Sequence, residues 1–413
     1  MPETLTLPRL RGPGGRPLRV AHLTTVDMSL DLLLGTELRA DVDSGLEVFG
    51  LSAPGPWVER VEQRGVRHVP LPSLTRSWDV TSDAAAAREL YRALRRLNLD
   101  VLHSHNPKTG VLGRLLGRAA RVPVVVNTCH GLWLRPGDGP ARRAFVLGTE
   151  SVAAWASHAE LYQNAEDRRT LRRAVRRRRS RVVGNGVDLE RFQPDPAGRA
   201  RVRRELGVDD GEPLVGGVGR RVAEKGIAEY AAAARALAGK ARFVWIGPDD
   251  PGKPDALRDE EAGVTFLGER TDMPAVYSAL DVFVLPSHRE GFSRSGMEAA
   301  ACGVASVLTD IRGCREIGEH EREVLLVPPR DAGALTAAVE RVLLDASLRA
   351  RLGDAARDRA ATHFDQREVA RTSLETYAAV ARRKGLDWQI EQSRGDERGT
   401  DETNGRGPYE KSG

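Results

Sequence analysis

The chain has 413 residues, of which 40% are apolar and 29% are charged, and its formal net charge is +5. Disorder along the whole chain is excluded, because the apolar fraction is ordinary for a folded protein and the net charge is small. At roughly 100–200 residues per domain, the length predicts two domains, each with its own core.

The sequence shows no signal for secretion, membrane insertion or structural metal. No apolar run approaches the ~20 residues that a membrane-spanning helix needs, and residues 1–17, rich in Pro, Gly and Arg, hold no apolar stretch typical of a secretory signal. The cysteines Cys129, Cys302 and Cys314 form no disulfide framework and match no zinc spacing. We therefore expect a cytoplasmic protein without metal or cofactor. The small basic excess does not indicate nucleic-acid binding.

Between residues 19 and 183, short apolar runs alternate with segments of helical spacing, such as Ser82–Leu97 and Lys108–Ala120. The predicted strands here cover residues 19–23, 46–51, 66–69, 100–103, 123–127, 159–162 and 181–183. Repeated strand–helix alternation predicts a parallel sheet with helices on both faces.

A second alternating region follows a break at residues 192–198, which is rich in Pro and Gly. Its predicted strands cover residues 214–218, 242–246, 264–267, 282–285, 304–308 and 324–327, and its predicted helices include Ile227–Leu237 and Ala334–Leu344. A last helix, at residues 368–383, has no strand after it. Residues 1–17 and 385–413 are polar and are expected to be disordered.

We therefore predict an α/β chain with two doubly wound domains, at residues 18–192 and 200–365, that face a central cleft. Ligands of such sheets bind outside the carboxyl ends of the strands, so the loops after strands are the candidate sites.

The strongest candidate site follows the strand at 282–285, where a loop carries Glu290 and a helix begins near Ser293. Free N–H groups at the start of that helix, together with Gly291, could approach an anion such as a diphosphate. Glu290 and Glu298 flank this turn, and carboxylates accept hydrogen bonds from the vicinal diols of a sugar and a ribose. The alternative is a capped helix with two solvated acids, but the position after a strand of the second domain favours a ligand site.

A second candidate, residues 216–226, follows the first strand of the second domain. Its glycines, including Gly219, permit a tight backbone, and Arg220 and Lys225 supply charge for a diphosphate. The stretch is neither a Walker loop nor a dinucleotide fingerprint.

Histidines follow two strands of the first domain. His130 lies on a loop expected to face the cleft, where it could donate to a ligand hydroxyl or stabilise charge; a structural histidine is the alternative. His103 and His105 have the spacing of a metal pair, but the sequence offers no third ligand, so we expect them to line the cleft.

Nine arginines occur in the fourteen residues 168–181. On a helix, Leu171 and Val175 would dock inward while the arginines surround them and grip anionic lipid or a lipid diphosphate. A solvated Arg-rich helix is the alternative. Nucleic acid is disfavoured, because no aromatic residue is interleaved for stacking.

Taken together and in this order, the motifs resemble those of the retaining, GT-B fold, family 4 glycosyltransferases. The likeness covers residues 19–383 and includes two glutamates, Glu290 and Glu298, with seven residues between them, the phosphate-binding stretch at 219–226 and the turn at 185–192. Residues 24–29 depart from the family, which usually has a Gly-Gly loop there.

The resemblance implies two Rossmann-like domains, with the nucleotide on the second, the acceptor on the first and the last helix crossing back to the first. It implies no metal. The implied catalytic residues are His130, Glu290, Arg220 and Lys225, and the implied donor-binding residues are Gly219, Gly291, Phe292, Ser293 and Glu298.

A narrower likeness, at residues 100–110 and 309–316, is to members that build capsular or other glycan chains on polyprenyl diphosphate. It implies transfer of a hexosyl or N-acetylhexosaminyl unit from a nucleotide-diphosphate sugar, such as a UDP-sugar, to a glycan or polyprenyl-diphosphate-linked acceptor. We expect peripheral binding to the anionic inner membrane surface, with His105, Lys108, Arg172 and Arg176 on the acceptor or membrane side.

Two other functions stay open at this point. One is a nucleotide-sugar epimerase or hydrolase on the same fold, and the other is a non-catalytic, basic membrane-binding protein.

Overall fold

The computed structural model describes residues 7–391 except residues 78, 106, 135–136, 176, 210, 252, 254 and 258–261. The chain divides into two compact units, each described here by itself. Unit 1 runs to Gly184 and resumes at Gln366, and unit 2 is Asn185–Asp365. The boundary therefore lies after residue 184 and not at residue 192, and the last helix belongs to unit 1.

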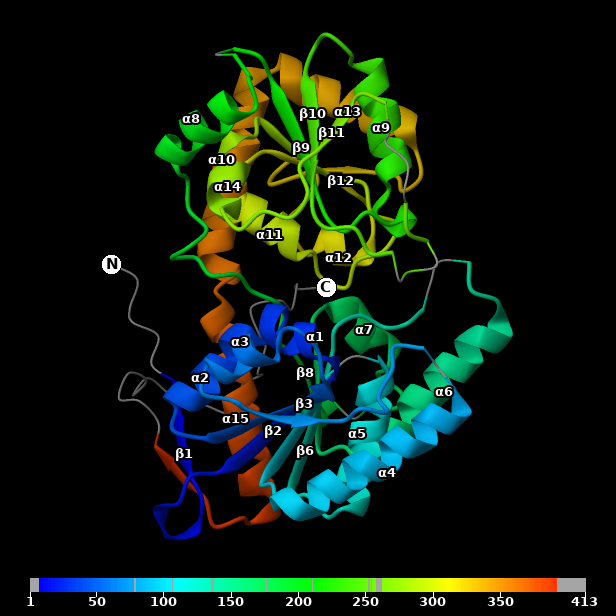
Figure 1. Ribbon diagram of the computed structural model, residues 1–413, viewed down its shortest axis with the longest axis vertical. Helices are drawn as coiled ribbons and strands as arrows, with labels where there is room; N and C mark the ends of the chain where they lie inside the picture. The colour runs from blue at the N-terminus through cyan, green and yellow to red at the C-terminus, as the bar shows by residue number, and fades with distance from the viewer. Residues whose placement is uncertain are drawn as a thin grey trace. The chain divides into compact units, whose positions relative to one another are not determined.

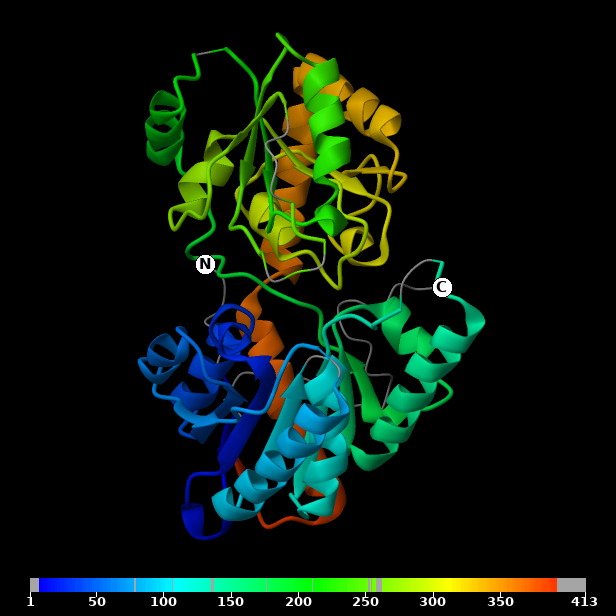
Figure 2. The same cartoon turned by 45° about the vertical axis from the view of Figure 1, so that its right-hand side comes forward.

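Unit 1 contains a seven-stranded parallel sheet with helices on both faces (Figures 1 and 2). Its strands are β2 (Arg19–Val26), β3 (Glu47–Ala53), β4 (Arg67–Pro70), β5 (Val101–His105), β6 (Val124–Cys129), β7 (Ala159–Tyr162) and β8 (Ser180–Val182). Its helices are α1 (Asp27–Leu32), α2 (Gly35–Asp43), α3 (Val58–Glu62), α4 (Val80–Leu97), α5 (Pro107–Ala119), α6 (Pro140–Ala156), α7 (Ala165–Thr170) and α15 (Gln366–Lys384). The strand order is β4-β3-β2-β5-β6-β7-β8.

Successive residues of the central strands of unit 1 enter two different cores, because side chains alternate along a strand. Val20 and Val101 pack with Leu374 of α15 on one face. Ala21 and Leu102 pack with the apolar side of α4 on the other face. Burial on both faces explains why these strands are continuous apolar runs in the sequence.

Unit 2 contains a six-stranded parallel sheet in the order β11-β10-β9-β12-β13-β14. Its strands are β9 (Leu214–Val218), β10 (Arg242–Ile246), β11 (Val264–Phe266), β12 (Val282–Leu285), β13 (Ser306–Thr309) and β14 (Leu325–Val327). Its helices are α8 (Pro196–Glu205), the 3-10 turn η3 (Ala223–Lys225), α9 (Ile227–Ala236), α10 (Met273–Ala279), α11 (Arg294–Ala301), α12 (Arg312–Arg315), α13 (Ala332–Leu344) and α14 (Ala346–His363). The predicted fold class, with two doubly wound parallel sheets, is confirmed.

Both predicted disordered ends are partly ordered, so that expectation is wrong for residues 7–17 and 385–391. Strand β1 (Arg9–Arg11), followed by the short turn η1 (Pro13–Gly15), pairs antiparallel with β15 (Gln389–Glu391). The reason is burial, since Leu10 is fully enclosed in the core of unit 1. The remaining end residues lie outside the described residues. Within the described part of the chain, no helix has the length and apolarity needed to cross a bilayer.

Candidate functional site

Each sheet has one switch point, where successive strands stop being added at one edge of the sheet and start being added at the other. In unit 2 this point lies between β9 and β12, and in unit 1 between β2 and β5. In open parallel sheets, ligands bind outside the carboxyl ends of the strands at this switch point. The loops after these four strands are therefore the places to examine.

In unit 2, glycines let these loops come into close contact. Gly226 has a φ of +73°, and a Cβ there would lie 2.1 Å from the carbonyl oxygen of Pro286. A Cβ on Gly313 would lie 2.7 Å from the backbone carbonyl oxygen of Glu290. Side chains at these positions would push the loops apart.

The loops bring together Lys225 and Glu290, which are 65 residues apart in the sequence. Lys225 Nζ donates to Glu290 Oε1 over 2.5 Å, and Ser287 Oγ donates to the same oxygen over 2.7 Å. The two charged side chains keep 17% and 13% of their surface exposed. A ligand can therefore reach this pair and exchange for one of its partners.

A second cation, Arg220, is paired with Asp250 through its guanidinium. Asp249 pairs with the neighbouring Arg221 over 3.1 Å. Glu224 lies 3.9 Å from guanidinium nitrogens of both Arg220 and Arg289. The cations of this region are thus balanced by acids that an anionic ligand would displace.

Helix α11 begins as predicted, directly after the loop that carries Glu290. Ser293 is its N-cap and accepts a hydrogen bond from Gly296 N over 3.0 Å. Phe292 is buried and contacts the ring of Phe364 edge-on, with centroids 5.8 Å apart. The N-terminus of α11 carries the positive end of the helix dipole and therefore favours an anion.

Glu298, in the second turn of α11, is held by its neighbours. Tyr277 OH donates to one carboxylate oxygen over 2.9 Å, and Arg294 Nε donates to the other over 3.1 Å. Burial raises the pKa of Glu298 above its ordinary value. The alternative of two freely solvated acids is therefore wrong for both Glu290 and Glu298.

His288 joins this region although the sequence indicated no role for it. Its Nε2 lies 2.8 Å from Glu229 Oε1 at the start of α9, and its backbone N–H donates to the carbonyl of Glu224. Its place inside the motif after β12 was the available signal.

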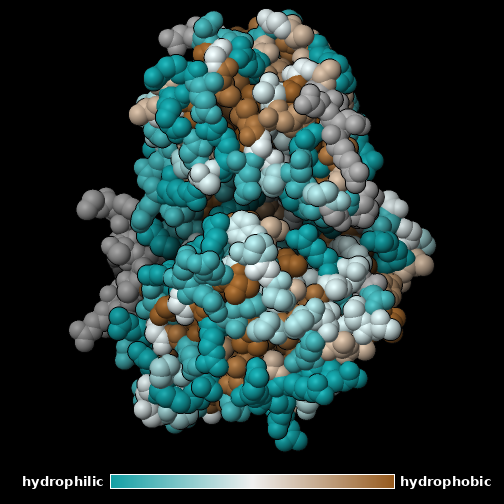
Figure 3. Space-filling model, in the orientation of Figure 1, coloured by the Kyte–Doolittle hydropathy of each residue, from teal (hydrophilic) through white to brown (hydrophobic). Residues whose placement is uncertain are grey.

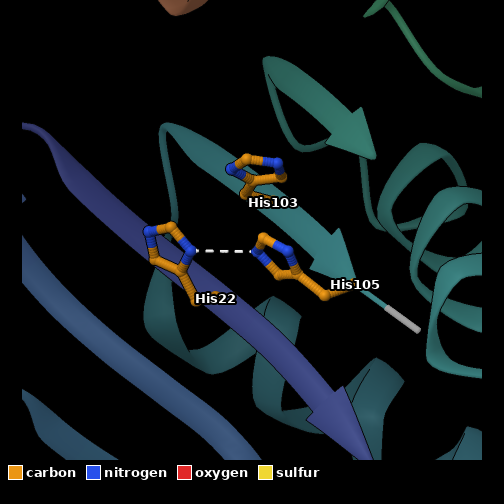
Figure 4. Close-up of side chains that lie close together, drawn as sticks. All are labelled: His22, His103 and His105. Atoms are coloured by element: carbon orange, nitrogen blue, oxygen red, sulfur yellow. Dashed lines mark hydrogen bonds between the residues drawn. The ribbon is translucent and has the colours of Figure 1, made fainter. Parts of the chain in front are cut away.

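In unit 1, the histidines at the switch point form a buried group, and the prediction that they line a cleft is wrong. His22 on β2 and both His103 and His105 on β5 have no exposed surface. His22 Nδ1 lies 3.1 Å from His105 Nε2 (Figure 4). His130, which was predicted on an exposed loop, is half-buried and so keeps part of its surface accessible. Its Nε2 lies 2.9 Å from His105 Nδ1.

His22 is a third histidine beside His103 and His105, and the sequence did not predict it there. Its position depends on the pairing of β2 with β5, two strands that are far apart in the sequence. One nitrogen from each of His22, His103 and His105 lies within 4.8 Å of the others. Both nitrogens of His103 are engaged, however, one with Tyr377 OH and one with Thr128 Oγ1, each over 2.7 Å. The ring of His103 also lies against that of His105, with centroids 4.2 Å apart. This geometry fits a hydrogen-bonded network better than three ligands around one ion.

Comparison with known proteins assigns a family to both halves. Residues 34–186 match the model of the glycosyl transferase 4-like domain, and residues 212–345 match that of glycosyl transferases group 1. The chain is 31% identical over 427 residues to the D-inositol 3-phosphate glycosyltransferase of Salinispora arenicola, covering 90% of this chain and 95% of the relative. It belongs to the group 1 glycosyltransferases.

Two further proteins are similar to this glycosyltransferase. The N,N'-diacetylbacillosaminyl-diphospho-undecaprenol alpha-1,3-N-acetylgalactosaminyltransferase of Campylobacter jejuni is 28% identical over 303 residues, 70% of this chain and 80% of the relative. The crystal structure of Anabaena Alr3699/HepE in complex with UDP-glucose has a TM-score of 0.75 at 19% identity, covering 88% of this chain and all of the other. The fold is the GT-B fold, and the predicted enzyme class is confirmed.

Lys108 and His105 were predicted to lie on the acceptor or membrane side. Both side chains are buried, so neither is accessible to an acceptor or a membrane. Lys108 is buried, forms an ion pair with Asp83 and donates to the carbonyl of Ser77 over 2.6 Å. It ties the loop before α4 to α5. Both predictions are wrong, because these side chains point into unit 1.

The prediction that residues 168–181 form one Arg-rich helix is also wrong. Helix α7 ends at Thr170, and a turn and the 3-10 helix η2 (Arg177–Arg179) follow. Leu171 and Val175 are buried as expected, Arg172 is exposed, and Arg176 lies outside the described residues. The spacing of two buried residues four apart fits a helix, but it equally fits this turn.

Beside this turn, helix α6 presents apolar residues to solvent. Phe145, Val152 and Trp155 are 62%, 61% and 78% exposed. Their spacing places them on one face of the helix, and Figure 3 shows apolar side chains at the surface in this part of unit 1. Val146, on the inner face, packs with Leu171 in one cluster.

Proposed function

We propose that this glycosyltransferase transfers a hexosyl or N-acetylhexosaminyl unit from a UDP-sugar to a glycan or polyprenyl-diphosphate-linked acceptor, with retention of anomeric configuration. The observation that carries the proposal is the contact of Lys225 with Glu290 at the switch point of unit 2. A cation for the diphosphate and a carboxylate for sugar hydroxyls lie there side by side, both accessible.

The two ends of the donor would use different groups. Lys225 and Arg220 bind the diphosphate, helped by the N–H groups of α11, because cations and helix N-termini both stabilise anions. Glu290 accepts from hydroxyls of the transferred sugar, and Glu298 accepts from the ribose.

The backbone near the helix start completes this donor site. Gly219, Gly291, Phe292 and Ser293 let the main chain approach phosphate and sugar closely. Unit 1 supplies the acceptor side, where His130 would face the transferred sugar.

The transfer step proposed is attack on the same face of the sugar. The bond from the anomeric carbon to the acceptor oxygen forms as the bond to the leaving phosphate oxygen breaks, and that phosphate oxygen takes the proton of the acceptor hydroxyl. Lys225 and Arg220 stabilise the charge that develops on the diphosphate. The step requires no metal in this proposal.

Relatives support the choice of substrates. The printed name of the Campylobacter jejuni relative describes a diphospho-undecaprenol acceptor, and the Anabaena structure holds UDP-glucose. The Salinispora arenicola relative is described as acting on D-inositol 3-phosphate, which makes that compound the second acceptor to test.

The first experiment measures thermal stabilisation by a panel of nucleotide sugars, because a ligand that binds only the folded state raises Tm. The stabilising donor is then incubated with undecaprenyl-diphosphate saccharides or with inositol 3-phosphate, and the product's anomeric configuration is read by NMR. We expect a UDP-sugar to stabilise and the product to keep the donor configuration. An inverted product would contradict retention.

The same donor incubated alone tests the alternative enzyme. Formation of an epimer or of free sugar at the rate of transfer would replace the proposal with an epimerase or a hydrolase. A protein stabilised by none of the nucleotide sugars would be a non-catalytic binder.

We further propose that unit 1 binds anionic membrane surfaces through the apolar face of α6 and the arginines of the neighbouring turn. Binding to vesicles containing anionic lipid should weaken with salt and should fall in Trp155→Ser and Arg172→Glu. Leu344→Ser, which changes an equally exposed apolar residue of α13 in unit 2, is the matched control. Equal binding by all three variants would contradict the proposal.

A further inference from the structure

Four side chains in unit 1 form one continuous hydrogen-bonded line. Asp41 Oδ2 of α2 lies 2.8 Å from His22 Nε2, and His22 Nδ1 lies 3.1 Å from His105 Nε2. His105 Nδ1 lies 2.9 Å from His130 Nε2. The first three members have no exposed surface. The line therefore joins a buried carboxylate to a histidine of the proposed site.

The hydrogens in such a line are not independent. A neutral imidazole has one donor nitrogen and one acceptor nitrogen, so the hydrogens of all three rings must point the same way. One direction runs toward Asp41 and places the hydrogen of His130 on Nε2. The other runs away from Asp41 and places it on Nδ1, which forms no close hydrogen bond with the described residues, although the side chain of Gln163 lies near the ring.

We propose that Asp41, His22 and His105 are positioning residues, and that one proton held at the Asp41–His22 end determines which ring nitrogen of His130 carries hydrogen. When the proton is present, all hydrogens point outward and His130 carries its hydrogen on Nδ1. When it is absent, they point inward and Nδ1 keeps a lone pair. The effect on transfer rests on the proposed function, but the state of the ring does not.

The proton balance of the line is simple. When His130 loses the hydrogen on Nδ1, its Nε2 takes one from His105 Nδ1, and His105 Nε2 takes one from His22 Nδ1. His22 Nε2 in turn takes the proton shared with Asp41 Oδ2. The negative charge that results stays on the carboxylate of Asp41. His130 can thus exchange a proton without becoming an imidazolium, which burial opposes by lowering its pKa to about 4.

The groups around Asp41 and His22 favour a proton at this end of the line. Among the described residues, only imidazoles form ion-pair contacts with Asp41 and with Glu37, which lies 3.5 Å from His103 Nδ1. Burial raises the pKa of Asp41. Burial also acts to lower the pKa of His22, but the hydrogen bond and charge of Asp41 outweigh it, so the pKa of His22 is raised.

The side chain of Gln163 also acts on the ring of His130. The other groups that face the line are His103, Tyr377 and Thr128, and these three form a separate branch. His103 bonds to the two hydroxyls and makes no hydrogen bond to the line. Tyr377→Phe therefore removes a buried hydrogen bond beside the line and leaves the line itself intact, which makes it the matched control.

The test is the ¹⁵N NMR spectrum of the full chain labelled at its histidine ring nitrogens, recorded from pH 5.5 to 9.5 and assigned for His130 with His130→Gln. We expect the hydrogen of His130 to move from Nδ1 to Nε2 as the pH rises. An unchanged His130 signal over this range would overturn the proposal, and so would a stoichiometric bound zinc or iron whose removal alters the ring signals.

Two variants sharpen the test. In Asp41→Asn the side chain at this end can no longer gain or lose a proton, so the ring nitrogen of His130 that carries hydrogen should not change with pH. In Tyr377→Phe the ¹⁵N signals of His130 should change with pH as they do in the natural chain. If Asp41→Asn does not fold, His22→Leu, which cuts the line, should abolish the pH dependence at His130. A shift that persists in the folded variant would overturn the proposal.

Transfer supplies the last readout. If the Nδ1–H form serves the donor sugar, kcat/KM should fall about tenfold, the value of one hydrogen bond, across the pH interval in which the ring changes. It should stay constant in Asp41→Asn. If the hydrogen of His130 changes nitrogen with pH but the protein has no transferase activity, the proposed function is contradicted and the role of the line is supported. If the protein transfers sugar but the hydrogen of His130 does not change nitrogen, the role of the line is contradicted and the proposed function is not.

Discussion

The two switch points have the same topology and opposite electrostatics. In unit 1 the two strands at the switch point carry imidazoles with no exposed surface, joined to one another and to two buried acids. In unit 2 the loops after the strands carry ion pairs that remain partly exposed, such as Lys225 with Glu290. Accessible pairs can exchange partners with a charged ligand, whereas the buried histidines and acids can exchange hydrogens only with one another and with His130. The same fold thus builds one accessible set of ion pairs and one buried hydrogen-bonded network.

The largest expected effect concerns buried charge in unit 1. Arg114 has 1% of its side chain exposed and bonds to Glu150 over 2.6 Å and to Glu160 over 3.3 Å. Arg114→Leu should lower the free energy of unfolding by about 3–5 kcal/mol, because it leaves buried carboxylates unpaired. Chemical denaturation measures this loss.

An exposed pair of unit 2 provides the control for that loss. Arg341 pairs with Glu321, and both side chains are about half exposed. Arg341→Leu should cost no more than about 1 kcal/mol. Equal losses in the two variants would break the contrast between a buried and an accessible set of charges.

The next effect is on activity. Lys225→Ala and Glu290→Gln should each lower kcat/KM by about 10²–10³, since each removes one group that acts on the donor, and the Tm of both should stay close to that of the natural chain. Lys240→Ala removes a more exposed lysine–glutamate pair of the same unit and should keep full activity. Full activity in either of the first two variants would refute the assigned site.

A smaller effect concerns pH and unit 1. Burial raises the pKa of Glu37 from 4.5 to about 7. The folded state therefore holds this proton more tightly than the unfolded state, so the stability it contributes is complete below pH 4.5 and is lost as the pH rises through about 7. Glu37→Gln should match the natural chain near pH 4.5 and exceed it in stability at pH 8, by on the order of 3 kcal/mol.

Urea unfolding at the two pH values measures this difference. Glu340→Gln, which changes an acid on the surface of α13, should show the same pH dependence as the natural chain. If Glu37→Gln also followed that dependence, Glu37 would be ionised in the fold and its raised pKa would be wrong.

The smallest effect separates the two roles of Ser293. Ser293→Ala should cost about 1 kcal/mol through loss of the α11 cap, whereas Ser293→Asp should retain the cap and repel the donor diphosphate. Asp331→Ala, at the cap of α13, should cost a similar amount without changing donor affinity. Calorimetric titration with UDP distinguishes these outcomes.

Much of this architecture could be predicted from the sequence, because doubly buried strands are continuous apolar runs. The strands at 159–162, 214–218, 242–246 and 282–285 have the predicted bounds. Strands β1 and β15 were missed, because each has three residues with mainly polar side chains and only their pairing makes them strands.

The candidate site divides in the same way. Glu290, Lys225 and the helix start at Ser293 were found because local motifs carry them. The partnerships of His22 with His105 and of Arg220 with Asp250 were missed, because they depend on which strands become neighbours. Burial of His105 and Lys108 could not be predicted either, since polar residues at strand ends are exposed or enclosed according to the helices that cover them.

The connection of the two units through Gly184 and Gln366 has a practical consequence. Unit 2 is one uninterrupted stretch of polypeptide, while unit 1 is made from both ends of the chain. Residues 185–365 can therefore be produced alone and assayed for UDP binding, whereas a fragment that stops at residue 184 lacks Leu374 and Tyr377 from its core and should aggregate. Joining residue 184 to residue 366 with a short linker would restore that core and give a separately folding unit 1.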